Sequence, residues 1–150
     1  MAKKICKLAQ LSPRKWAILL QLILFSWVAA LALRLVGLPR LVRFIAQGAV
    51  KPWPSRFPLG HNRYEVGQVT SLVELATRVT HGHGRCLARS LLMFWILKVR
   101  GEPAELLIGV RKEASALRSH AWIEARGIVM SDSEEITGCF ATLLRFCVEQ

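Results

Sequence analysis

The chain has 150 residues, which is enough for one compact domain with a modest hydrophobic core. It contains 21 Lys and Arg against 10 Asp and Glu, and the net charge of +11 favours an anionic partner, whether nucleic acid, a membrane surface or an acidic polypeptide. Its 4 cysteines include no CxxC pair, which argues against a disulfide scaffold and favours a reducing, cytoplasmic compartment.

The N-terminal part of the chain is expected to be helical. Ser12-Pro13 is typical of an N-cap followed by a first-turn proline, and it predicts a helix over 13–36. A shorter basic helix is expected over 39–46. The uncharged run 16–33 lies at the lower edge of membrane-spanning length. A buried helical hairpin and an interfacial or membrane helix are therefore both open interpretations of this segment.

Residues 49–62 are rich in Pro, which predicts a linker between an N-terminal helical region (1–48) and a core (63–150). In that core, the sequence pattern predicts helices over about 65–80 and 86–99, strands over 104–111, 119–125 and 128–130, and a further helix over 136–148. Arg126-Gly127 predicts a tight turn between the last two strands. The expected fold class is α+β, with N-terminal helices before a core that has a central helix and a small antiparallel sheet.

Three residues could form a catalytic set: Cys86, His120 and Asp132. Cys86 begins a predicted helix, where the positive partial charge of the helix N-terminus stabilises a thiolate. His120 lies in a predicted strand, and the antiparallel hairpin that follows would return Asp132 to its side. A thiol nucleophile needs a base, and the base needs a group that holds it in the right tautomer.

Each of the three also has an ordinary structural interpretation. Cys86 could be a buried structural cysteine, and His120 a polar residue on a half-exposed strand face shared with Trp122 and Glu124. Asp132 could be a turn residue or the N-cap of the last predicted helix.

Other kinds of site have weaker support. His81, His83 and Cys86 could bind zinc, but no second compact ligand pair follows them, so no metal is expected. The chain has neither GxxxxGK[ST] nor GxGxxG, so no nucleotide cofactor is expected. Its basic residues are not interleaved with an aromatic stacking platform, and nucleic acid is therefore not an expected partner.

The order and layout of Cys86, His120 and Asp132 resemble those of papain-like and transglutaminase-like folds. The chain also contains R-C-L-x-R-S-L, then G-x-P-A-x-L-x-I-G-V, then H-A-W-I-E followed by G-x-V and an Asp. This set resembles the stand-alone, transglutaminase-like leader peptidase (B protein) of lasso-peptide biosynthesis. The N-terminal L-S-P-R and the leucine-rich helix after it are also similar, so the resemblance covers nearly the whole chain.

The resemblance implies a cytoplasmic thiol protease that removes the leader from a ribosomally made precursor through a thioester acyl-enzyme. Cys86 would be the nucleophile, His120 the base and Asp132 the orienting carboxylate. A separate leader-recognition protein and an asparagine-synthetase-like macrolactam cyclase would be its partners, besides the precursor peptide. Papain-like enzymes often carry a Gln before the cysteine for the oxyanion hole. Here that region reads Thr80-His81-Gly82-His83, so the side-chain donor is unassigned.

Two alternatives remain open. An acyltransferase or transglutaminase could use the same three residues with an amine as the acceptor. A basic adaptor without enzymatic activity could bind a peptide or make peripheral contact with a membrane. Arg34, Arg40 and Arg43 are either an electrostatic docking surface for the precursor or its recognition protein, or a solvated helix face.

Overall fold

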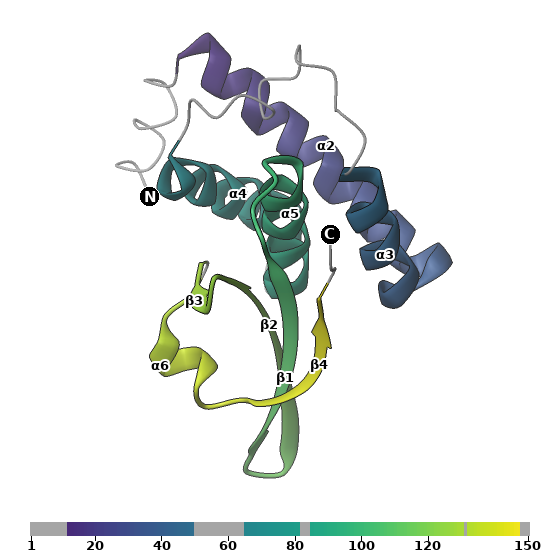
Figure 1. Cartoon of the computed structure of the whole chain (residues 1–150), viewed down its shortest axis with the longest axis vertical. Coiled ribbons are helices and arrows are strands. Elements are labelled where there is room, and N and C mark those ends of the chain that lie inside the picture. The colour runs from purple at the N-terminus through teal and green to yellow at the C-terminus, as the bar shows by residue number, and fades with distance from the viewer. Residues whose placement is uncertain (1–11, 50–64, 82–84, 131, 148–150) are drawn as a thin grey trace.

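The computed structural model describes residues 12–49, 65–81, 85–130 and 132–147 of the chain. Four helices come first: α2 (Pro13–Val36), α3 (Leu38–Ala49), α4 (Val66–His81) and α5 (Arg85–Val99). They are followed by β1 (Glu105–Glu113), β2 (Ala116–Ala125), β3 (Ile128–Val129), α6 (Glu134–Thr137) and β4 (Ala141–Phe146). The fold is α+β as predicted, with the long helices at one end, the sheet at the other and α5 between them (Figure 1).

Helix α2 buries one face and exposes the other. Pro13 occupies its first turn, and the helix ends at Val36, as predicted; Gly37 follows it at a φ of +76°. Ile18 and Leu22 are almost fully buried where α2 packs on α4 and α5. By length and composition, Lys15–Val36 could cross a membrane, with a mean hydropathy of 2.2, and 22% of its most apolar stretch is buried in the fold.

Helix α5 is the centre of the hydrophobic core, as its sequence predicted. Its buried side chains contact α4, α2 and the sheet, and they include Leu91, Met93, Phe94, Ile96 and Leu97. Burying a side chain of this size stabilises the fold by about 1.5–3 kcal/mol. Ser90 is also fully buried, and its hydroxyl donates to the carbonyl of Ala121 at 2.9 Å, which fixes α5 against β2.

The sheet is antiparallel with the strand order β3-β2-β1-β4. β1 and β2 form a long hairpin whose register places Gly109 opposite His120. The predicted turn between β2 and β3 is confirmed: Arg126 and Gly127 have φ values of +54° and +76°, as both central residues of a type I′ turn require. The hairpin of β2 and β3 thus directs the chain back toward α5.

The predicted helix over 136–148 is wrong. Helix α6 is short, and the chain then extends into β4, which pairs with β1 between Leu106 and Phe146 and between Val110 and Ala141. The edge of β1 presents backbone N–H and C=O groups that need partners, and β4 supplies them. The predicted linker falls almost wholly within 50–64, outside the described residues, so the proposed division into 1–48, 49–62 and 63–150 stays a prediction.

Candidate active site

Cys86 is the second residue of α5 and is partly buried. The pKa of its thiol lies below the ordinary value of 9.0, chiefly because of a hydrogen bond with the His120 side chain. Burial opposes this effect, while the backbone of Ala121 and of Leu87 reinforces it through further hydrogen bonds. His120 on β2 is therefore the main group that stabilises a thiolate here, and the start of α5 contributes the smallest of these effects, through the backbone of Leu87.

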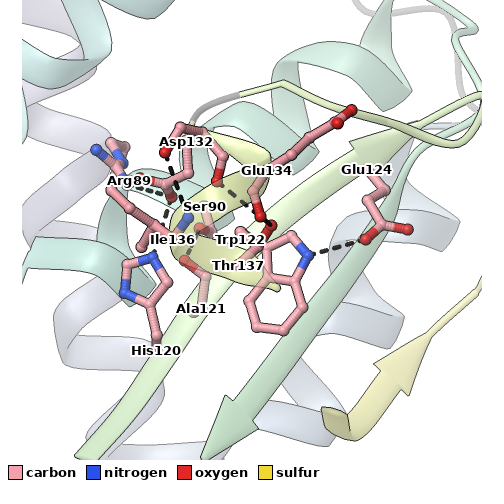
Figure 2. Close-up of polar contacts among 11 residues, drawn as sticks. Arg89, Ser90, His120, Ala121, Trp122, Glu124, Asp132, Glu134, Ile136 and Thr137 are labelled. Atoms are coloured by element: carbon pink, nitrogen blue, oxygen red, sulfur yellow. Dashed lines mark hydrogen bonds and ion pairs between the residues drawn. The ribbon is translucent and has the colours of Figure 1, made fainter. Parts of the chain in front are cut away.

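His120 joins this thiol to Asp132. Its Nε2 lies 3.1 Å from Oδ2 of Asp132, and the two side chains are only 18% and 9% exposed (Figure 2). The hydrogen bond to Asp132 and then the one to Cys86 raise the pKa of His120 from 6.5 to about 9. With Nε2 engaged by the carboxylate, Nδ1 is the ring nitrogen left for the thiol. The structure therefore brings all three predicted site residues together.

Arg89 is a fourth member of the cluster, and its role was not predicted from the sequence. Its Nη2 donates to the same Oδ2 of Asp132 at 2.5 Å, and the Arg89 side chain is 14% exposed. Burial acts to raise the pKa of Asp132, but hydrogen bonds from His120 and Arg89 outweigh it and hold that pKa below 3.8. Arg89 lies three positions after Cys86, so both face the same side of α5, but its partner 43 residues away is not readable from that spacing.

Asp132 is not the N-cap of the helix that follows it. Ser133 is the N-cap of α6, and its hydroxyl accepts from the backbone N–H of Ile136 at 3.4 Å. The adjacent Asp132 side chain is directed at His120 and Arg89 instead, as Figure 2 shows. Ser133 therefore caps α6, and the neighbouring Asp132 side chain contacts the imidazole of His120.

Aromatic side chains hold the imidazole in place. The His120 ring is stacked 6.3 Å from Trp122 and lies 5.2 Å from Phe140, measured between ring centroids. The Trp122 indole N–H donates to Glu124 at 2.9 Å, so Trp122 and Glu124 share the strand face of His120 as predicted. A Cβ at Gly109 would lie 2.8 Å from Phe140 and 2.9 Å from Trp122. Gly109 and Phe140, which the sequence analysis did not assign, therefore let the aromatic rings close over the sheet.

Of the three residues considered as zinc ligands, only the Cys86 side chain lies in the described part of the chain. Residues 82–84 lie outside the described part of the chain, and the side chain of His81 is not described either. Among the residues that the structure does describe, no group of three His, Cys, Asp or Glu could hold a metal ion. What the described residues do assemble is a thiol, an imidazole and a carboxylate in hydrogen-bonded sequence.

One comparison with known proteins places the chain in a family. No curated protein and no solved structure matches the chain. The profile of the transglutaminase-like superfamily matches residues 26–145, a region that runs from within α2 to β4 and includes Cys86, His120 and Asp132. This match spans most of the chain and agrees with the observed mixed fold. The chain therefore belongs to the transglutaminase-like superfamily.

Proposed function

We propose that this protein is a cysteine peptidase that removes the leader from a ribosomally made lasso-peptide precursor. The observation that carries the proposal is the hydrogen-bonded series Cys86–His120–Asp132, with the pKa of the thiol lowered and that of the imidazole raised. Such opposite shifts favour a thiolate–imidazolium pair, which is an activated nucleophile beside a ready proton donor. The substrate class rests on the resemblance of the sequence around these residues to the lasso-peptide leader peptidases.

In the first half-reaction, the Cys86 thiolate attacks the carbonyl carbon of the scissile peptide bond, forming a C–S bond and an oxyanion. First-turn amides of α5 lie beside the sulfur and are suited to stabilise that oxyanion, because amides there lack helical partners. Collapse of the intermediate breaks the C–N bond. The His120 imidazolium gives its proton to the leaving amine, which becomes the new N-terminus.

In the second half-reaction, neutral His120 takes a proton from water while the water oxygen attacks the thioester carbonyl. The C–S bond breaks, the new carboxylic acid loses its proton to solvent, and the leader leaves with a C-terminal carboxylate while the thiolate–imidazolium pair is restored. Asp132 remains ionised throughout and stabilises the imidazolium, since its own pKa is held low by His120 and Arg89 once burial is outweighed. A separate leader-recognition protein would present the precursor, and a macrolactam cyclase would consume the freed core peptide, in the cytoplasm.

Mass spectrometry of a precursor peptide incubated with the protein in heavy-oxygen water tests this function. Hydrolysis places one heavy oxygen in the new leader carboxylate, and Cys86→Ala should lower the cleavage rate by about 10³–10⁶-fold. Cys139→Ala is the matched control, because Cys139 is exposed and should not affect the rate.

Other products would contradict the peptidase assignment in distinct ways. A leader amide formed on adding a primary amine, with little carboxylate, would identify an acyltransferase that uses the same residues. Absence of any product, with and without a recognition protein, together with slow and uniform labelling of the cysteines, would favour a binding adaptor. Full cleavage by Cys86→Ala would remove Cys86 from the mechanism.

A further inference from the structure

The net charge of the chain is confined to one part of its sequence. Residues 1–64 contain no Asp or Glu, whereas residues 65–150 contain ten acidic and ten basic side chains. The whole excess of +11 therefore belongs to the part that includes α2 and α3. Residues 65–150, which include Cys86, His120 and Asp132, are electrically balanced. Any anionic partner recognised by charge should accordingly bind residues 1–64, the part of the chain that includes α2 and α3.

These same helices carry a large exposed apolar face. Leu20, Leu24, Leu31 and Leu35 are between 58% and 74% exposed and follow the helical repeat along one side of α2. Phe44 of α3 is 74% exposed as well. Monomeric soluble proteins seldom present a continuous apolar surface on this scale, and such surfaces commonly mark an interaction site.

An apolar groove adjoins this face. It has a volume of about 570 Å³ and lies between α2, α3 and α5, with walls that include Phe25, Ala29, Phe44 and Trp95. Arg40 is the one charged residue among those that line it. Apolar walls beside a guanidinium match the two ends of an anionic lipid, an acyl chain and a phosphate. The groove contains none of the residues Cys86, His120 and Asp132, so it is separate from the candidate active site.

The packing of α2 decides how it would meet a bilayer. Ile18, Leu19 and Leu22 are 3% exposed or less, on the side of α2 that contacts α4 and α5. Ser26 is fully buried and its hydroxyl lies 3.0 Å from that of Thr80 on α4. If α2 crossed the membrane, these contacts with α4 and α5 would be lost. An in-plane position keeps them and still places the exposed leucines in the acyl boundary.

We propose that the outer face of α2 and α3 docks in-plane on an anionic lipid surface. The leucines of α2 and Phe44 enter the headgroup–acyl boundary, while Arg34, Arg40 and Arg43, all exposed and on the same two helices, bind lipid phosphates. Figure 1 shows α2 and α3 at the opposite end of the molecule from α6, the helix next to Asp132. The docked protein would therefore leave its catalytic cluster open to substrate.

Flotation of the purified full-length chain with vesicles tests the proposal. Vesicles of phosphatidylcholine and phosphatidylglycerol in equal amounts should bind the protein, and vesicles of phosphatidylcholine alone should bind it far less. The triple variant Arg34→Gln, Arg40→Gln, Arg43→Gln should partition about 100-fold more weakly, since each basic residue contributes about fivefold. The matched control Arg118→Gln, Arg126→Gln, Arg145→Gln removes the same charge from the sheet and should bind as the parent does.

A second triple variant tests the apolar contribution. Leu20→Gln, Leu24→Gln, Leu31→Gln should lose at least about 100-fold in partitioning, because burial of each leucine in the bilayer is lost. Leu117→Gln with Leu143→Gln on the sheet is its control, since these leucines are 76% and 63% exposed there. The substituted side chains are all more than half exposed, so the thermal midpoint should not fall.

Three results would overturn the proposal. Equal partitioning into neutral and anionic vesicles would remove the role of the arginines. A change from dimer to monomer in the leucine variant, without vesicle binding by the parent, would assign the face to a second copy of the chain. Loss of precursor or recognition-protein binding in the arginine variant, again without vesicle binding by the parent, would assign it to a peptide partner.

Discussion

Asp132 accepts two hydrogen bonds at a single oxygen, from His120 at 3.1 Å and from Arg89 at 2.5 Å. This geometry distinguishes an orienting carboxylate from a turn residue, because a turn residue would have no reason to be only 9% exposed and paired with two cations. The imidazole of His120 is thereby fixed on one side by Asp132 and on the other by the Cys86 thiol.

The pH dependence of activity follows from these contacts. The proposed mechanism needs a Cys86 thiolate and a protonated His120, so kcat/KM should rise through the lowered pKa of Cys86 and fall as His120 loses its proton near pH 9. Asp132→Asn should cut turnover by roughly 10–10³-fold. It should also move the basic limb to lower pH, because the bond to Asp132 is the largest cause of the raised pKa of His120.

Ser133→Ala serves as the control for this pH profile. It removes the cap of α6 and should cost about 0.5–2 kcal/mol of stability while both limbs keep their positions. An Asp132→Asn profile that overlays the parent profile would show that Asp132 does not act on His120.

Arg89 should act as a positioning residue through Asp132. Arg89→Gln should lower kcat/KM by about 10–100-fold, because the lost bond joins two charged groups. The loss should be greatest in acid, since the pKa of Asp132 would rise without Arg89. Arg89→Lys should recover part of the activity, because it restores the charge without the planar guanidinium.

The matched control for Arg89 is Arg78→Gln. Arg78 forms an exposed pair with Glu74 one helical turn away, and such a pair contributes only about 0.3–0.5 kcal/mol. Steady-state kinetics across pH on both variants would separate them. Equal activity in Arg89→Gln and Arg78→Gln at every pH would show that the contact of Arg89 with Asp132 has no catalytic consequence.

At the scale of elements, Gly109 in β1 leaves room for the aromatic rings that pack beside His120. It pairs with His120 across β1 and β2, and no side chain fits there beneath Phe140 and Trp122. Gly109→Ala should destabilise the fold by about 1–3 kcal/mol, measured by denaturant unfolding, because the aromatic rings must shift. Gly67→Ala in α4 is the control: it meets no atom within 4 Å and should be slightly stabilising. Equal free energies of unfolding for the two variants would mean that the rings of Phe140 and Trp122 can shift without destabilising the fold.

The elements differ in how far the sequence could predict them. Helices α2 and α5 are long and carry strong boundary signals, Ser12-Pro13 and Gly37 in one case and Gly101 in the other, so their bounds agree with prediction. Strand β4 was predicted as helix because Ala141–Phe146 contains residues that suit both structures. Its conformation is decided by the free edge of β1, a tertiary feature that no local pattern reports.

In the candidate site, too, local features could be predicted from the sequence and tertiary contacts could not. The order Cys86, His120, Asp132 was readable because the helix start, strand and hairpin that carry these residues are local features. The roles of Arg89 and Phe140 could not be predicted from the sequence. Each residue contributes through a contact that forms only when α5, β2 and the segment around α6 are packed together.

At the scale of the whole molecule, the N-terminal helices belong to the core that supports the site. Ile18, Leu19 and Leu22 of α2 join one continuous buried cluster with residues of α5 and the sheet. A chain restricted to 63–150 loses these contacts, each worth about 1.5–3 kcal/mol, which together approach the full stability of a small domain. We therefore expect 63–150 to be aggregated or unfolded by circular dichroism, whereas 12–150 folds. A cooperative unfolding transition in 63–150 would establish it as an independent domain.

The central claim is that Cys86 is a thiolate maintained by His120, and its alkylation rate as a function of pH tests this most directly. Purified protein would be treated with iodoacetamide and the modified cysteines located by peptide mass spectrometry. Cys86 should react well below its ordinary pKa of 9.0, at least about tenfold faster than exposed Cys139 at neutral pH, and His120→Ala should abolish that advantage. A Cys86 rate that equals that of Cys139, or that does not change in His120→Ala, would contradict the claim.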